Sequence, residues 1–254
     1  MGMDISELFW NASLEELKSG YIENKQHYIC LLCGKYFEKG IVYPEDGVMY
    51  ESGRYVRIHI EKTHSSAFEY LIQMDRKLTG LTDHQKKLML LFYQGKSDKE
   101  VQEELGIGSA STIRNHRFIL KEKERQAKVF LAMMELLKER DDYAPTFVNV
   151  HKTASMIDDR YNVTQEENEA ILTKYFPEGI KGPLKAFFSR KEKHKLVVLR
   201  EIAKRFDSER SYTEKEVNQI LKSAYDDYVT LRRYLIDYGF LDRKFDGSQY
   251  WLRK

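Results

Sequence analysis

The 254-residue sequence is poor in proline and glycine, with 4 and 14 residues respectively. Long disordered linkers are rich in these residues, so the composition excludes such a linker as a major part of the chain. Long apolar runs are also missing, since none approaches the roughly 20 residues that span a bilayer. We therefore expect no membrane span. The first 20 residues are acidic and amphipathic, unlike a secretory signal, and we expect a cytoplasmic protein.

An excess of charge of one sign is missing as well. The sequence has 42 Lys and Arg against 40 Asp and Glu, for a formal net charge of +2. Any nucleic-acid surface must therefore come from local clusters of basic residues. Cysteine is limited to Cys30 and Cys33. Two cysteines this close together make a structural disulfide unexpected and favour a metal or redox role.

Common catalytic motifs are missing too. The sequence has no nucleophile elbow, phosphate-binding loop, His-Glu-x-x-His pair or Rossmann glycine set, and we do not expect an enzyme. Hydrophobic residues make up 42% of the sequence and charged residues 32%, a balance that indicates small helical units with much solvated surface. We predict a mainly α, multi-domain protein with domains at 1–80, 81–140 and 141–254.

The first candidate site lies in residues 28–64. Cys30 and Cys33 form a Cys-x2-Cys pair, and His59 and His64 form a His-x4-His pair in a segment of helical character. These spacings suit a tetrahedral zinc site, and four protein ligands leave no open position, so we predict structural Zn2+. Two alternatives stay open. One is a metal-free cysteine pair with two surface histidines, and the other is a redox Cys-x2-Cys, which the lack of a surrounding βαβ pattern disfavours.

The run YICLLCGKYF at 28–37 closely resembles the start of a C2H2 zinc finger. In that family about a dozen residues separate the two ligand pairs, whereas residues 34–58 separate them here. The inserted segment has turn signals at Pro44 and Asp46-Gly47 between Tyr- and Val-containing runs, which predicts an added hairpin. The resemblance implies zinc, but with this insertion the finger's helix need not enter DNA.

The second candidate site lies in residues 95–128. Ser97-x-x-Glu100 predicts a capped helix, Gly106 supplies a turn, and Ser109 or Ser111 can cap a second helix. This layout is that of a helix-turn-helix whose second helix, here the reader helix (111–121), enters the DNA major groove. Asn and Arg can read base edges, while Lys and helix N-termini bind phosphate. The residues that we predict to contact DNA are Ser111, Thr112, Arg114, Asn115, Arg117 and Lys121.

Several short runs are similar to the LuxR-type helix-turn-helix, which is allied to region four of sigma factors. They are Leu81-Thr82, Gly95 to Val101, Leu105 to Ile107 and Thr112 to His116. The resemblance covers about residues 81–135 and implies double-stranded DNA as the partner. Beyond the reader helix the same helix is predicted to continue to Arg140. Its apolar stripe suits the core, an inter-domain contact or a homodimer seam, and the sequence leaves these open.

The third candidate site follows residues 141–145, which break the helix and mark a domain boundary. Residues 181–205 are rich in Lys and Arg, which favours either a phosphate-binding surface or a solvated face. Two predicted helices in 213–239 then precede a hairpin around Asp246-Gly247. This order resembles the winged helix, a fold that binds DNA or protein. The DNA contacts that it implies are Arg232, Arg233, Arg243 and Lys244.

The order of the three parts is similar to a bacterial family of transcriptional regulators with a finger-like N-terminus, a LuxR-type helix-turn-helix and a C-terminal domain of unknown function. The likeness lies in residues 111–117, 121–128 and 212–218. It implies DNA binding, and RNA polymerase is a further expected partner. The alternatives are a protein-interaction adaptor in transcription and a metal- or redox-responsive switch. RNA binding is disfavoured because no aromatic stacking platform on a sheet is apparent.

Overall fold

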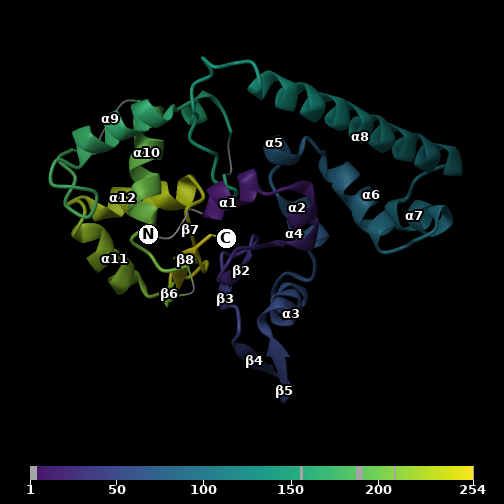
Figure 1. Cartoon of the computed structure of the whole chain (residues 1–254), viewed down its shortest axis with the longest axis horizontal. Helices are drawn as coiled ribbons and strands as arrows, with labels where there is room; N and C mark the ends of the chain where they lie inside the picture. The colour runs from purple at the N-terminus through teal and green to yellow at the C-terminus, as the bar shows by residue number, and fades with distance from the viewer. Residues whose placement is uncertain (1–4, 155–156, 187–190, 209, 254) are drawn as a thin grey trace. The chain divides into compact units, whose positions relative to one another are not determined.

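The computed structural model describes residues 5–154, 157–186, 191–208 and 210–253. The protein is mainly helical with small sheets (Figure 1). It divides into two compact units, one made of residues 1–78 with 146–254 and the other of residues 79–145. The N-terminal and C-terminal segments, which were predicted as separate domains at 1–80 and 141–254, thus share one unit. Residues 187–190 of the predicted basic run lie outside the described part of the chain.

The N-terminal segment combines short helices with two small sheets. Its helices are α1 (Ile5–Asn11), α2 (Leu14–Ser19), α3 (Ser52–His64), α4 (Ala67–Gln73) and α5 (Arg76–Thr79), and its strands are β1 (Tyr21–Glu23), β2 (His27–Cys30), β3 (Tyr36–Glu38), β4 (Val42–Glu45) and β5 (Val48–Glu51). Strands β1, β2 and β3 form an antiparallel sheet in that order. Strands β4 and β5 pair as the hairpin predicted within the insertion. Helix α3 contributes Val56 and Ile60 to a small core around Phe37.

The second unit contains α6 (Asp83–Tyr93), α7 (Asp98–Leu105) and α8 (Ala110–Lys138). Helices α6 and α7 each begin with a capping box, in which a Ser or Thr hydroxyl and a Gln or Glu side chain satisfy free amides. Gly106 ends α7 with a φ of 63°, a left-handed conformation that glycine adopts without the strain of a Cβ atom. The core of this unit is small and consists of Leu88, Leu91, Val101 and Ile113.

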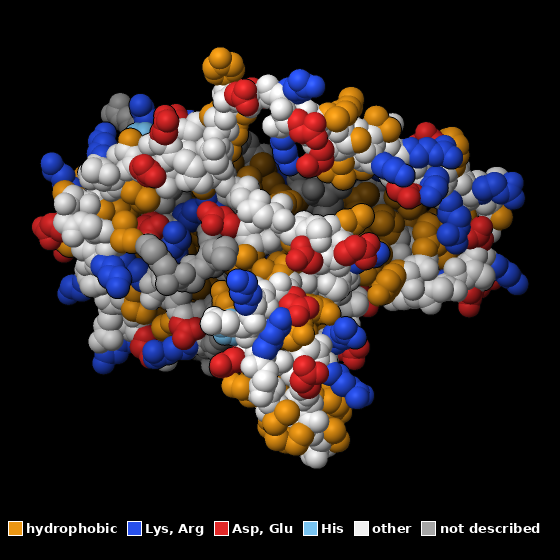
Figure 2. All heavy atoms as spheres, viewed as in Figure 1, with side chains coloured by type: hydrophobic (Ala, Val, Ile, Leu, Met, Phe, Trp, Pro, Cys, Tyr) orange, Lys and Arg blue, Asp and Glu red, His pale blue; other side chains and the backbone are white. Residues whose placement is uncertain are grey.

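Helix α8 changes character along its 29 residues. Figure 2 shows Lys and Arg side chains gathered over its N-terminal half and apolar side chains over its C-terminal half. The apolar side chains that are more than half exposed are Val129, Phe130, Leu131, Met133, Leu136 and Leu137. The stripe predicted for this region is therefore a surface feature of the structure.

The C-terminal segment holds the largest core. Its elements are η1 (Asp159–Tyr161), α9 (Gln165–Tyr175), α10 (Glu192–Ala203), β6 (Ser211–Tyr212), α11 (Glu214–Lys222), α12 (Tyr228–Asp237), β7 (Leu241–Arg243) and β8 (Tyr250–Leu252). The three strands form an antiparallel sheet in the order β6-β8-β7. Leu199 and Ile202 of α10 lie at the centre of the core, together with Leu221, Leu231 and Leu235 of the next two helices.

Residues 147–154 explain why the two end segments form one unit. The indole Nε1 of Trp10 in α1 donates a hydrogen bond to the carbonyl oxygen of Val150 at 2.6 Å. The Thr153 hydroxyl donates a hydrogen bond to the carbonyl oxygen of Gly239, which follows α12, at 2.9 Å. Residues 147–154 are thus tied to the N-terminal segment through Val150 and to the end of α12 through Thr153.

Candidate metal centre and helix-turn-helix surface

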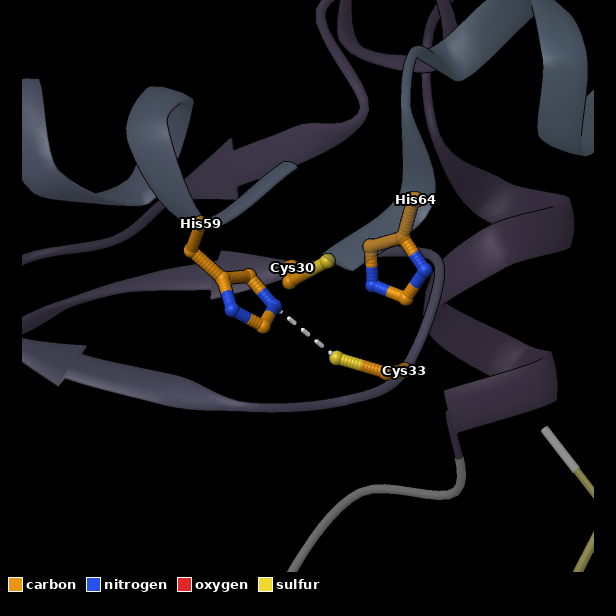
Figure 3. Close-up of side chains that lie close together, drawn as sticks. All are labelled: Cys30, Cys33, His59 and His64. Carbon is orange, nitrogen blue, oxygen red and sulfur yellow. Dashed lines mark hydrogen bonds between the residues drawn. The ribbon is translucent and has the colours of Figure 1, made fainter. Parts of the chain in front are cut away.

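Cys30, Cys33, His59 and His64 come together in the N-terminal segment (Figure 3). Cys30 ends β2, Cys33 lies in the turn before β3, and both histidines lie on α3. One ligand atom from each residue lies within 4.8 Å of all the others. Both cysteines are buried, and both histidines are partly buried. The four predicted ligands could therefore hold one metal ion.

A tight turn places the two sulfur atoms on the same side of the backbone. The amide of Gly34 donates to the carbonyl oxygen of Cys30 at 2.8 Å, and the amide of Cys30 donates to the carbonyl oxygen of Lys35 at 2.9 Å. Gly34 has a φ of 82°, where another residue would be strained. We call residues 30–35 the knuckle. Its geometry is local, which explains why the Cys-x2-Cys-Gly pattern could be recognised in the sequence.

The two histidines also have the orientation that metal ligands require. His59 Nε2 lies 3.2 Å from Cys33 Sγ, while its Nδ1 lies 3.2 Å from the Thr63 hydroxyl. Such a contact to the second ring nitrogen orients many metal-binding histidines. His64 Nε2 is buried and has no hydrogen-bond partner among the described residues. An unpaired buried nitrogen is costly, and a metal ion at the cluster would satisfy it.

The two thiols differ in their affinity for protons. The hydrogen bond from Cys30 lowers the pKa of Cys33 far below its ordinary value, with smaller contributions from His59 and His64. The same hydrogen bond, together with burial, raises the pKa of Cys30. One thiolate is therefore favoured in the metal-free cluster. Binding of a divalent ion would displace the remaining proton, so metal affinity should depend on pH.

The predicted DNA contacts at the start of α8 lie on the protein surface. Ser111, Thr112, Arg114 and Asn115 are all exposed. The Ser109 hydroxyl accepts a hydrogen bond from the amide of Thr112 and so caps the helix. Within the described part of the chain, the side chains of Arg114 and Asn115 make no hydrogen bond or ion pair. They are available to a ligand.

Arg117 and Lys121 have partners within the unit. The Arg117 guanidinium donates two hydrogen bonds to Asp98 Oδ1, at 2.8 and 2.9 Å, and lies 3.7 Å above the ring of Phe92. It therefore ties α8 to α7 and α6. Lys121 Nζ lies 2.7 Å from Glu124 Oε2 on the same helix. Sequence reasoning missed the role of Arg117 because its partners are distant in sequence.

The four predicted contacts of the C-terminal segment also separate into two kinds. Arg232 Nη1 donates to Glu214 Oε1 and to Asn218 Oδ1, each at 2.6 Å, and only 15% of its side chain is exposed. It holds α12 against α11. The remaining three residues are exposed, one on α12 and two at the hairpin between β7 and β8: Arg233, Arg243 and Lys244.

Comparison with known families gives one match, to the C-terminal segment. Residues 185–252 match the family described as "Uncharacterized protein conserved in bacteria (DUF2087)". The segment is similar to a bacterial family. It runs from just before α10 to β8 and covers less than a third of the chain. Comparisons with curated proteins and with solved structures found no match. Among the described residues, no helix combines the length and apolarity that crossing a membrane requires.

Proposed function

We propose that this protein is a sequence-specific DNA-binding transcription regulator. The observation that carries the proposal is the exposure of Arg114 and Asn115, without partners among the described residues, in the first turns of α8. Their types suit bidentate contacts to guanine and adenine in the major groove. Ile113, the residue before Arg114, is buried in the small core of the unit and holds this part of α8 in place. The capped N-terminus of α8 adds amide groups that favour a phosphate.

The C-terminal segment supports a second DNA surface. The order α10, β6, α11, α12, β7 and β8, with β6 paired to β8, agrees with the order expected for a winged helix and supports that interpretation. In this interpretation α12 is a second groove helix and residues 244–249 are the wing. Arg233, Arg243 and Lys244 are exposed there and can neutralise phosphates. Arg232 is part of the scaffold instead, because Glu214 and Asn218 hold it.

We further propose that the metal in the knuckle cluster is Zn2+ with a structural role. Two thiolates and two imidazoles are a preferred tetrahedral donor set for zinc. When bound, the ion supplies cross-links between the knuckle and α3, and it satisfies His64 Nε2. Four protein ligands leave no position for a substrate. Metal analysis of the purified protein should give one zinc per chain.

The test of DNA binding uses the full chain with its metal. DNA fragments would be selected from a random pool, and affinity for the selected site and for unselected DNA measured at two salt concentrations. Arg114→Ala and Asn115→Ala should each weaken binding to the selected site about tenfold or more, from about 1–3 kcal/mol per bidentate contact. Binding to unselected DNA should change little. The matched control is Arg140→Ala, which removes an exposed arginine beyond the end of α8.

Two results would count against the proposal. Equal losses on selected and unselected DNA would mean that Arg114 and Asn115 contact phosphates without reading sequence. No salt-dependent binding at all would remove DNA as the partner, because phosphate contacts make affinity fall with salt.

A protein-interaction role for the C-terminal segment is the second candidate. It is favoured by the apolar side chains at the positions where a winged helix meets its ligand: Val229 at the start of α12 is 52% exposed and Phe245 at the hairpin is fully exposed. RNA polymerase is the partner to try first. If Phe245→Ser abolishes co-sedimentation with the polymerase while the double variant Arg243→Ala, Lys244→Ala leaves DNA affinity unchanged, this segment docks protein.

A further inference from the structure

His84 and His116 face each other across two helices of the second unit. His84 lies in the first turn of α6, and His116 lies in the second turn of α8. Their Nε2 atoms are 3.4 Å apart and their ring centroids 5.0 Å apart. His84 is exposed and His116 is partly buried, so solvent reaches the pair. Neither residue belongs to the knuckle cluster.

The separation of the two nitrogens suits metal ligands better than a hydrogen bond. Hydrogen bonds donated by N–H groups are typically about 2.7–3.2 Å long, so 3.4 Å is a weak contact. Two imidazole nitrogens at about 2.0–2.1 Å from one metal are about 3.3–3.4 Å apart at a tetrahedral ion and about 2.8–3.0 Å apart at the 90° angle of a square-planar or octahedral ion. The histidines therefore already have the spacing of two ligands of a tetrahedral ion, and they lie within about 0.6 Å of the spacing that the other geometries require.

The core of the unit holds the two histidines in this arrangement. Leu88, one turn after His84, and Ile113, one turn before His116, are both fully buried. These two residues pack in the same small core and fix α6 against α8. A metal ion would then meet two ligands that are already positioned, so little conformational freedom is lost on binding.

We propose that His84 and His116 form a second metal site, for an exchangeable divalent transition-metal ion such as Ni2+, Cu2+ or Zn2+. Imidazole suits these ions, and affinity is expected to follow their usual order with Cu2+ tightest. In the described part of the chain, no third Cys, His, Asp or Glu joins the pair to form a larger ligand group. Water completes the coordination, which makes this site weaker and faster to exchange than the knuckle.

An ion at this site cross-links the first helix of the unit to the helix that carries Arg114 and Asn115. The site itself does not depend on DNA binding. Where the proposed function holds, Ni2+ should alter the DNA affinity of the wild type and not that of a variant without the two histidines. Metal binding is counted in the absence of DNA. A protein that binds no Ni2+ at this site can therefore be distinguished from a protein that does not bind DNA.

The test is equilibrium dialysis of the full chain, first freed of loosely bound metal so that it carries one zinc per chain, against Ni2+, with nickel and zinc counted per chain. We expect one Ni2+ to bind with the zinc retained. His84→Gln and His116→Gln should each weaken Ni2+ binding at least tenfold, and the double variant should be no weaker than either single variant, because one remaining histidine no longer chelates. His27→Gln, a change of a partly exposed histidine in β2, is the matched control and should bind Ni2+ like the wild type.

Three outcomes would overturn the site. Nickel binding could persist in both single variants, it could fall additively as for independent histidines, or nickel could only replace zinc. A second measurement covers any variant that folds poorly. In the wild type, Ni2+ should slow amide hydrogen exchange in α6 and α8, because a ligand that binds only the folded form stabilises it. Unchanged exchange at saturating Ni2+ would also overturn the proposal.

Discussion

Lys152 donates a hydrogen bond from Nζ to the carbonyl oxygen of Leu31, 2.9 Å away and 121 residues earlier in the chain. It also donates to the carbonyl oxygen of Leu32. These two carbonyl groups lie in the knuckle, and Lys152 itself is only 5% exposed. The rings of Phe9 and Tyr70 lie 5.9 and 5.2 Å from the ammonium group. The C-terminal segment thus supplies a buried cation that supports the candidate metal centre.

Replacing this cation should destabilise the first unit. Lys152→Met keeps the length of the side chain but leaves two buried carbonyl oxygens without their donor, at a cost of about 1–3 kcal/mol in the free energy of unfolding. Urea denaturation of the zinc-loaded chain measures it. Lys25→Met changes an exposed lysine and should have almost no effect. Equal denaturation midpoints for the two variants would show that the Lys152 contacts add nothing to stability.

The contact between Thr63 and His59 should tune metal affinity. Thr63→Val removes the hydroxyl group 3.2 Å from His59 Nδ1 and leaves the four ligands in place. Loss of such a partner typically weakens metal binding by 10–100-fold, and we expect about tenfold here because Thr63 is exposed. Competition with a chromophoric chelator measures the zinc affinity. Thr173→Val, the same change at an exposed position of α9, should leave it unaltered.

Arg114 and Arg117, three residues apart on α8, should respond differently to the same substitution. Arg117→Met removes an exposed ion pair and a cation–π contact, which together are worth about 1 kcal/mol. Amide hydrogen exchange in α7 should therefore quicken about fivefold. Arg114→Met should leave this exchange unchanged, because among the described residues the Arg114 side chain makes no hydrogen bond, ion pair or cation–π contact. The reverse pattern would contradict the structural role of Arg117.

Local signals in the sequence were sufficient for several elements. The capping box of Ser97 and Glu100, the left-handed turn at Gly106, and the hairpin around Asp46-Gly47 each depend on residues only a few positions apart. Cys-x2-Cys and His-x4-His spacing likewise identified a ligand set that the fold brings together. These features follow from short-range geometry, which a single sequence records.

Contacts between distant residues could not be predicted in this way. Arg117 and Arg232 were both interpreted as free basic side chains, yet carboxylates 19 and 18 residues away hold them. Lys152 shows the same limit over a longer range. Whether a charged side chain is free depends on what the tertiary fold places opposite it, and a single sequence contains no pattern for that.

Gly239 should tolerate no side chain. It ends the turn after α12 with a φ of 79°, and a Cβ atom there would lie 2.6 Å from the carbonyl oxygen of Thr153. Gly239→Ala therefore adds a steric clash to the cost of a left-handed alanine, which is about 1–2 kcal/mol. Gly247→Ala is the control, since its φ is 71° but its Cβ would meet only Tyr250 Oη at 3.6 Å.

We expect Gly239→Ala to lower the free energy of unfolding by at least about 2 kcal/mol more than Gly247→Ala does, because backbone atoms cannot move aside as a flexible side chain can. Urea denaturation of both variants compares them directly. Similar losses would mean that residues 153 and 239 separate at little cost, and the tie between the two end segments would then be weak.

His151 should make the first unit sensitive to mild acid. Burial, followed by the charges of Arg200 and Arg253, lowers the pKa of His151 to about 3 from an ordinary value of 6.5. Its Nε2 lies 2.9 Å from the Tyr161 hydroxyl and its Nδ1 lies 3.1 Å from the Thr153 hydroxyl. The folded protein therefore holds the neutral ring down to a pH at which the unfolded chain is already protonated.

The sign of the effect follows from proton binding. Between pH 6.5 and 3 the unfolded chain binds one more proton at this residue, so the stability that is fully present above pH 6.5 is lost as the pH falls. The loss is about 1.4 kcal/mol for each pH unit below 6.5. Urea denaturation at pH 7.5 and 5.5 should show it in the wild type. In His151→Gln, which is less stable at pH 7.5, the difference between the two pH values should be smaller by about 1.4 kcal/mol. An unchanged difference would assign the acid sensitivity to other groups, such as the cysteine and histidine ligands of the knuckle cluster.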